Sequence, residues 1–240
     1  MIKERVSTGI PGLDESTNGG FEKDSAIMVS GGGGSGKTIF GVQFLMEGIT
    51  QNNETGVYIS FEENKEKFIK HMTQFGWDLE KLVKQGRFVF IQYEPERIAS
   101  LVEAGGERLK KSIQDINAKR IVIDSLSAFL VLFEKESEQR RMLVKLFDMI
   151  ASWGCTVVVV GEEDHYLGQP RSSILGFMAD AIILLYTCPV SSDPGSMIRA
   201  MQISKMRGSK HNFHLFPYKI TDKGFIAYPR ESIRGIKGIS

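Results

Sequence analysis

The stretch at residues 31–38, Gly-Gly-Gly-Gly-Ser-Gly-Lys-Thr, limits the possible folds of this chain more than any other feature. It fits the pattern G-x-x-x-x-G-K-[ST], in which a glycine-rich loop between a strand and a helix surrounds nucleotide phosphates. The flanks agree, because residues 26–30 predict a buried strand and residues 39–46 an apolar helix. A flexible glycine-rich linker would have neither a fixed lysine nor this context. The stretch therefore predicts a phosphate-binding loop in an α/β fold.

Each residue type in this loop has a chemical reason. Glycines let successive backbone N–H groups turn toward one anion, and the following helix adds the positive end of its dipole. Lys37 would reach the β- and γ-phosphates, and Thr38 would give its hydroxyl to Mg²⁺. We expect ATP and Mg²⁺ as cofactors. The residues predicted to bind the nucleotide here are Gly33, Gly34, Ser35, Gly36, Lys37, Thr38 and Ile39.

Strand and helix patterns alternate along the chain as far as residue 161. The predicted strands are 57–61, 88–91, 120–124 and 156–161, and the predicted helices include 64–75, 98–116 and 136–153. Gly105 and Gly106 interrupt the second of these helices, and Val144 belongs to the apolar side of the third. Such alternation predicts a mostly parallel central sheet flanked by helices. Short connections then join extended segments at 180–186, 197–205, 213–220 and 225–228, which predicts an antiparallel C-terminal extension. We interpret residues 1–240 as a single domain, with a loose tail at 230–240.

Composition gives no support for a nucleic-acid-binding, membrane or secreted protein. Thirty basic residues nearly balance 29 acidic ones, so net charge gives no reason to expect nucleic acid or an acidic membrane as partner. No apolar run reaches transmembrane length, and the N-terminus lacks the apolar core of a signal peptide, so we expect a cytoplasmic protein. Cys155 and Cys188 lie in apolar surroundings without C-x-x-C spacing and are predicted to be buried thiols.

Acidic residues follow two of the predicted strands. In parallel sheets ligands sit at the carboxyl ends of the strands, so these acids should lie near the phosphate-binding loop. Asp124 ends an apolar strand, where a phosphate-loop enzyme places its Mg²⁺ carboxylate. Glu62 and Glu63 follow another strand, and at least one is predicted to orient or deprotonate the attacking water. Sequence alone leaves open which of the two is the main base. His71 and His165 have no partner at ligand spacing and are read as ordinary histidines.

A compact basic cluster, containing Lys205, Arg207 and His211, ends one of the later extended segments. One interpretation is a solvated turn. The other is a set of cations for a phosphate, possibly on a neighbouring subunit in the manner of an arginine finger. The residues alone favour neither interpretation.

Taken together, these motifs resemble the KaiC-like branch of the RecA superfamily of P-loop NTPases, over about residues 6–229. The matching segments are the lead-in at 8–14 with Gly19 and Gly20, the glutamate strand at 60–63, the aspartate strand at 121–126 and the basic element at 205–211. The resemblance implies a RecA-like fold, with Glu62 and Glu63 as the water-activating pair. It also implies that Lys205, Arg207 and His211 reach the nucleotide of the adjacent protomer in a homo-oligomeric, hexameric ring.

The chain departs from that pattern in two ways. It has one copy of a domain that clock-type KaiC has twice, and 176–179 carries no hydroxyl where the clock kinase has its acceptor pair. We therefore expect a magnesium-dependent ATPase that hydrolyses ATP and acts as an oligomeric, nucleotide-driven switch. The alternative is a recombinase paralogue that binds single-stranded DNA, motivated by Arg171, Arg230, Arg234 and Lys237. An autokinase that uses Ser172 or Ser173 is a weaker hypothesis.

Overall fold

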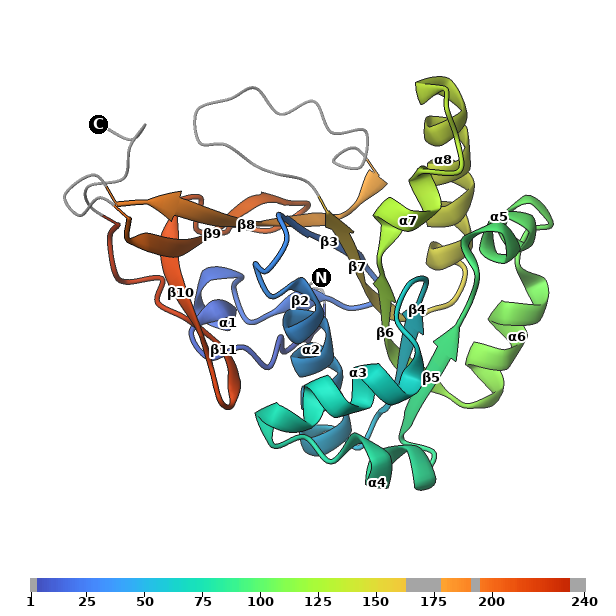
Figure 1. The fold of residues 1–240 in the computed structure, drawn as a ribbon, viewed down its shortest axis with the longest axis horizontal. Coiled ribbons are helices and arrows are strands. Elements are labelled where there is room, and N and C mark those ends of the chain that lie inside the picture. Colours follow the sequence, from blue (N-terminus) through green and yellow to red (C-terminus); the bar gives the residue numbers. More distant parts are fainter. Residues whose placement is uncertain (1–3, 163–177, 191–194, 234–240) are drawn as a thin grey trace.

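The computed structural model describes residues 4–162, 178–190 and 195–233, and its centre is a twisted nine-stranded sheet (Figure 1). The strand order is β11-β10-β9-β8-β3-β7-β6-β4-β5. The six strands from β8 to β5 in this order are mutually parallel, whereas β9, β10 and β11 pair antiparallel. A mostly parallel sheet with an antiparallel C-terminal extension is the predicted fold class, which is confirmed.

The elements have the following bounds. The sheet strands are β3 (Ala26–Gly31), β4 (Thr55–Ser60), β5 (Phe88–Gln92), β6 (Ala118–Asp124), β7 (Thr156–Glu162), β8 (Ala181–Pro189), β9 (Met197–Met206), β10 (Phe216–Thr221) and β11 (Gly224–Ala227). A separate two-stranded antiparallel sheet pairs β1 (Arg5–Val6) with β2 (Phe21–Glu22). The helices are α1 (Leu13–Ser16), α2 (Lys37–Gln51), α3 (Lys65–Met72) with the 3₁₀ turn Thr73–Phe75, α4 (Leu79–Lys84), α5 (Pro95–Glu103), α6 (Glu107–Asp115), α7 (Leu126–Leu130) and α8 (Glu136–Ala151).

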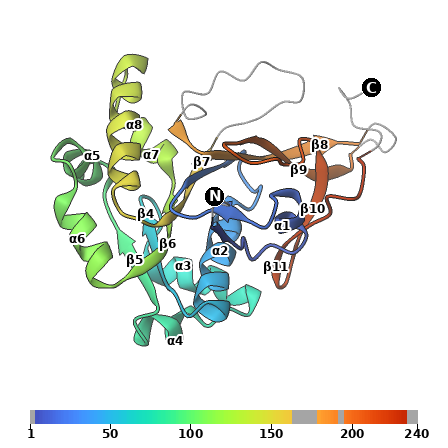
Figure 2. The ribbon, with the colours of Figure 1, turned by 180° about the vertical axis from the view of Figure 1, so that it is seen from behind.

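Two helical layers cover the sheet, one on each face (Figures 1 and 2). Side chains of β3 alternate between them: Ile27 and Val29 pack in the core under α2, α3 and α4, and Met28 packs in the core under α5 to α8. Because both faces are buried, the central strands are continuously apolar rather than alternating. This explains why they stood out in the sequence.

Two of the predicted helices differ in detail from the structure. The single helix predicted at 98–116 is two helices, because Gly105 and Gly106 both have a positive φ and α6 begins only after them. Val144 was predicted on the buried side of α8 but is 38% exposed, whereas its neighbour Leu143 is fully buried. Residues 98–116 thus belong to two helices separated by a glycine turn.

The first residues of the predicted C-terminal tail contact the rest of the domain. In the tail predicted to be loose, Arg230 pairs with Glu15 and Ile233 packs against a small buried cluster, so the first residues of that segment have defined contacts.

Cys155 and Cys188 are both buried and free, as predicted. Within the described ranges, no helix combines the length and the apolar character needed to cross a membrane.

Candidate functional site

The glycine-rich loop connects β3 to α2, as the sequence predicted. Gly36 has φ +91°, and Lys37 directly after it is the first residue of α2. A Cβ atom on Gly36 would lie 2.5 Å from Cδ1 of Ile220 on β10, so backbone conformation and close approach both require glycine. The Lys37 ammonium donates to the carbonyl oxygens of Gly31 at 2.7 Å and Gly32 at 2.9 Å. The lysine therefore lies folded over the loop it would serve.

A tyrosine on β10 binds the backbone of the glycine-rich loop. The Tyr218 hydroxyl donates to the carbonyl oxygen of Ser35 at 2.8 Å, and its ring stacks on Phe225 with centroids 4.7 Å apart. Burial raises the pKa of Tyr218 well above its usual range, so the hydroxyl stays protonated. Ser35 itself is 1% exposed, and its own hydroxyl has no partner among the described residues. Ser35 can therefore meet a nucleotide through its backbone, not its side chain.

Two predicted magnesium residues meet at the start of α2. The Thr38 hydroxyl donates to Oδ2 of Asp124, the last residue of β6, at 2.6 Å. The hydroxyl of Tyr58 on β4 donates to the same oxygen at 2.5 Å. Burial, followed by the charge of Asp124, raises the pKa of Tyr58 well above its usual range. Asp124 thus accepts two hydroxyl hydrogen bonds on one oxygen.

This oxygen-rich corner fits Mg²⁺. A hydroxyl and a carboxylate at a helix N-terminus are hard ligands, and in phosphate-loop enzymes the remaining ligands are phosphate oxygens and water. Such a site needs no cage of protein carboxylates. The described part of the chain contains no group of three or more His, Cys, Asp or Glu side chains that could hold a metal by itself.

The two glutamates after β4 have different partners. Glu62 accepts a hydrogen bond from the Ser125 hydroxyl at 3.1 Å, and Glu63 Oε1 lies 2.9 Å from Nδ1 of His71 on α3. In the sequence His71 has no metal-ligand spacing, and nothing there indicated this contact with Glu63. The side chain of Glu63 is 26% exposed and that of His71 46%, so both remain open to the site.

Glu63 and His71, but not Glu62, line a pocket of about 440 Å³ beside the loop. Besides predicted residues, its wall contains Arg199 from β9, whose guanidinium forms no hydrogen bond or ion pair within the part of the chain described here. Arg199 and His71 were not predicted as site residues, because each belongs to an element whose position opposite the loop is set by tertiary structure. The pocket is lined by Gly34, Gly36, Lys37, Thr38, Ile39, Glu63, His71, Met72, Arg199 and Ile220.

The basic element lies at the other end of the sheet. The backbone N–H of Arg207 bonds to the carbonyl of Asp180, whose own N–H bonds to Ala26, the first residue of β3. The glycine-rich loop follows the last residue of β3, so Arg207 cannot reach the loop of its own chain. The Arg207 guanidinium pairs with Asp180 at 3.4 Å. The structure therefore does not bring the basic element to the pocket within one chain.

The other members of the basic element have local contacts. The Lys205 ammonium donates to the carbonyl of Ala179 at 2.7 Å, and burial, assisted by the charge of Arg207, lowers the pKa of Lys205. His211 Nδ1 lies 3.2 Å from the carbonyl oxygen of Ser209. None of these groups lines the pocket described above.

Several predicted residues lie outside the described ranges. These are Ser172 and Ser173 of the autokinase hypothesis, Arg171, Arg234 and Lys237 of the DNA-binding hypothesis, and His165. Both hypotheses stay predictions.

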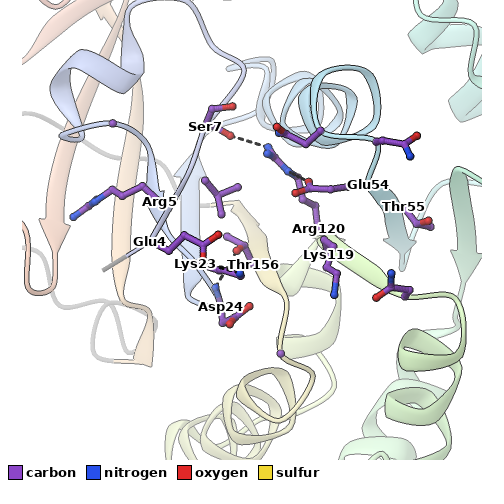
Figure 3. Close-up of a pocket in the computed structure, with 16 residues that line it drawn as sticks. Glu4, Arg5, Ser7, Lys23, Asp24, Glu54, Thr55, Lys119, Arg120 and Thr156 are labelled. Atoms are coloured by element: carbon purple, nitrogen blue, oxygen red, sulfur yellow. Dashed lines mark hydrogen bonds and ion pairs between the residues drawn. The ribbon is translucent and has the colours of Figure 1, made fainter. Parts of the chain in front are cut away.

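A larger pocket, of about 730 Å³, opens at the amino-terminal edge of the sheet (Figure 3). Its wall contains Arg120, which is 1% exposed and donates to Glu54 at 2.6 Å and to the carbonyl of Ser7 at 2.7 Å. None of the residues predicted to bind nucleotide lines it. Because Arg120 also donates to the carbonyl of Phe44, we read its network as a clamp on the C-terminal half of α2.

Comparison with known proteins gives a consistent result. The family profile described as "ATPase: KaiC" matches residues 6–232. The chain is 34% identical to a UPF0273 protein of Pyrococcus furiosus, over 96% of both chains. It is 32% identical to the circadian clock oscillator protein KaiC of Synechococcus elongatus, over 96% of this chain and 45% of the relative. A crystal structure of a KaiC-like protein from Pyrococcus horikoshii superimposes with a TM-score of 0.81 and 31% identity, over 95% of this chain and 100% of that one.

Proposed function

The chain belongs to the KaiC ATPase family of P-loop proteins, and from this premise we propose that it is a magnesium-dependent ATPase whose sites are completed between subunits. Membership in the family supports ATP binding. Hydrolysis, the role of each residue and the oligomeric switch are our proposal.

One observation carries it. The glycine-rich loop, the Thr38–Asp124 contact and the Glu63 carboxylate lie together at the carboxyl edge of the parallel strands. Phosphate binding, metal binding and water activation are the three requirements of phosphoryl transfer to water. Here the residue types for all three border the same pocket or contact its lining.

Binding is assigned to the loop and the start of α2. Backbone N–H groups of the loop and the N-terminus of α2 attract the phosphates, and Lys37 exchanges the carbonyls of Gly31 and Gly32 for phosphate oxygens. Mg²⁺, when bound, neutralises the charge that develops on the phosphates. Thr38 and Asp124 would hold it. Arg199 adds a further positive charge on the opposite wall of the pocket.

Water activation is assigned to the glutamates. Glu63 lines the pocket and serves as the main base, accepting a proton from the attacking water. His71 holds one of its oxygens by the 2.9 Å contact and leaves the other available. Glu62 is turned toward Ser125 and shapes the water site from its far side.

The basic element is assigned to a neighbouring subunit. Lys205 and Arg207 lie at the opposite sheet edge from their own loop, so they can act on a phosphate only in trans. A head-to-tail ring places one edge of each subunit against the opposite edge of the next. We propose a homo-oligomeric ring, hexameric by family resemblance, in which His211 lies beside the neighbour's nucleotide.

The first test is binding and hydrolysis. Calorimetry should detect uptake of MgATP, and phosphate release should fall about 100-fold or more in Glu63→Gln, the range expected for loss of a general base. Glu66→Gln is the matched control, because Glu66 lies in the first turn of α3 but does not line the pocket. Folded protein that takes up no MgATP would refute the proposal, and undiminished hydrolysis by Glu63→Gln would remove the role of Glu63.

The second test is complementation between subunits. Lys37→Ala and Arg207→Ala should each be inactive alone, since one removes the loop lysine and the other the trans cation. Mixing them before assembly should restore activity at about one quarter of the interfaces of a head-to-tail ring. Arg207→Ala with full activity, or mixtures that stay inactive, would contradict action in trans.

A further inference from the structure

Tyr58 has a hydroxyl in a place where the core needs only an aromatic ring. Its side chain lies in the middle of β4 and is 2% exposed. The ring packs on Phe68 of α3, with centroids 4.3 Å apart, and stacks on Phe90 of β5 at 5.8 Å. A phenylalanine would make the same contacts. The hydroxyl is therefore not explained by packing.

The hydrogen bond that this hydroxyl donates runs to Asp124. Burying a hydroxyl without an acceptor costs free energy, and here the acceptor is the carboxylate predicted to serve Mg²⁺. Tyr58 and Thr38 both donate to Oδ2 of Asp124, and no described residue donates to Oδ1. Two donors on one oxygen fix the rotation of the carboxylate and leave the other oxygen without a donor among the described residues.

The support behind Tyr58 is rigid. Its ring is held between a helix and a neighbouring strand, both of which pack in the same core as the first half of α2. A donor on such a ring has little freedom to move, so the carboxylate that it binds is fixed as well. Partners behind a metal ligand act in this way to set its orientation.

We propose that Tyr58 is a positioning residue for the magnesium site, holding Asp124 so that Oδ1 and the Thr38 hydroxyl face the metal–nucleotide complex. This rests on the proposed function and extends it, because Tyr58 then affects nucleotide affinity only when Mg²⁺ is present. The requirement for Mg²⁺ separates this role from a purely structural one.

The experiment compares the full-length protein with Tyr58→Phe, which keeps the ring and its packing. ADP affinity is measured by calorimetry with Mg²⁺ and again with EDTA. We expect about a tenfold loss of affinity with Mg²⁺, the lower end of the effect of outer partners of metal ligands, and an unchanged affinity in EDTA. Tyr186→Phe is the matched control, because Tyr186 is also 2% exposed and donates to Gln202, away from the pocket.

A double-mutant cycle with Asp124→Asn tests the route. If Tyr58 acts through Asp124, then Tyr58→Phe should have no further effect on Mg²⁺-dependent affinity in the Asp124→Asn background. Equal affinity of Tyr58→Phe and wild type with Mg²⁺, or equal losses with Mg²⁺ and EDTA, would overturn the inference alone. Absence of MgADP and MgATP binding to the wild type would instead overturn the proposed function, and this inference with it.

Discussion

Replacing Glu54 with glutamine should destabilise this protein far more than the same change at an exposed glutamate. Glu54 neutralises Arg120, whose guanidinium is 1% exposed and lies over the Phe44 ring at 4.7 Å. Without Glu54 the buried charge keeps only neutral acceptors, the carbonyl oxygens of Ser7 and Phe44. One nitrogen of this guanidinium, Nη2, already has no partner among the described residues.

The magnitude follows from the geometry. Removing one partner of a fully buried ion pair costs about 3–5 kcal/mol. The side chain of Glu54 is 23% exposed, and glutamine keeps an oxygen that can accept from Arg120, so we expect about 2–3 kcal/mol. In a chain of this size each kcal/mol lowers Tm by about 2–4 °C, which predicts a decrease of about 5–10 °C.

The assay is thermal unfolding followed by circular dichroism, at one protein concentration for all variants. Glu103→Gln is the control, because Glu103 contacts Arg141 and Lys145 at the surface, where ion pairs contribute little. We expect its Tm to match wild type. A Glu54→Gln variant that melts within about 1 °C of wild type, less than a change of 1 kcal/mol would produce, would refute the clamp on α2.

Three further predictions concern the loop and the buried thiols. Gly36→Ala should weaken MgATP binding more than tenfold (about 1.4 kcal/mol) in calorimetry, because its methyl group would collide with Ile220 on β10. Gly86→Ala is the control, because Gly86 also has a positive φ but has open space around it and should leave the affinity unchanged. Equal affinities of the two variants would contradict this prediction. Tyr218→Phe should lower stability by about 1 kcal/mol in urea unfolding through its lost bond to the loop, and an unchanged midpoint would count against that bond. Burial raises the pKa of Cys155 to about 11 and that of Cys188 in the same direction, so thiol reagents at pH 8 should label them only on unfolding; rapid native labelling would show otherwise.

Local patterns in the chain were enough for much of the fold and part of the site. The glycine-rich loop is one contiguous segment, and its backbone conformation requires glycine at Gly36 whatever surrounds it. Strands buried on both faces are continuously apolar, so β3, β6 and β7 were recognisable in short windows. Asp124 followed from the same reasoning, because parallel strands end at one edge of the sheet. The approach of Thr38 to Asp124 agrees with that expectation.

Tertiary structure alone decided the rest. In the sequence Tyr58 cannot be distinguished from any other core aromatic residue. Only the pairing of β4 with β6 shows that its hydroxyl contacts Asp124. Arg199 lies near the start of β9 and lines the pocket, whereas Arg207 directly follows the end of β9 and lies away from the pocket. The register of β8 and β9 fixes both positions. A sequence specifies residue types and local periodicity over a few neighbours. Which strands lie side by side, and in which register, depends on packing across the whole sheet, so contacts between distant strands are determined only when the complete core forms.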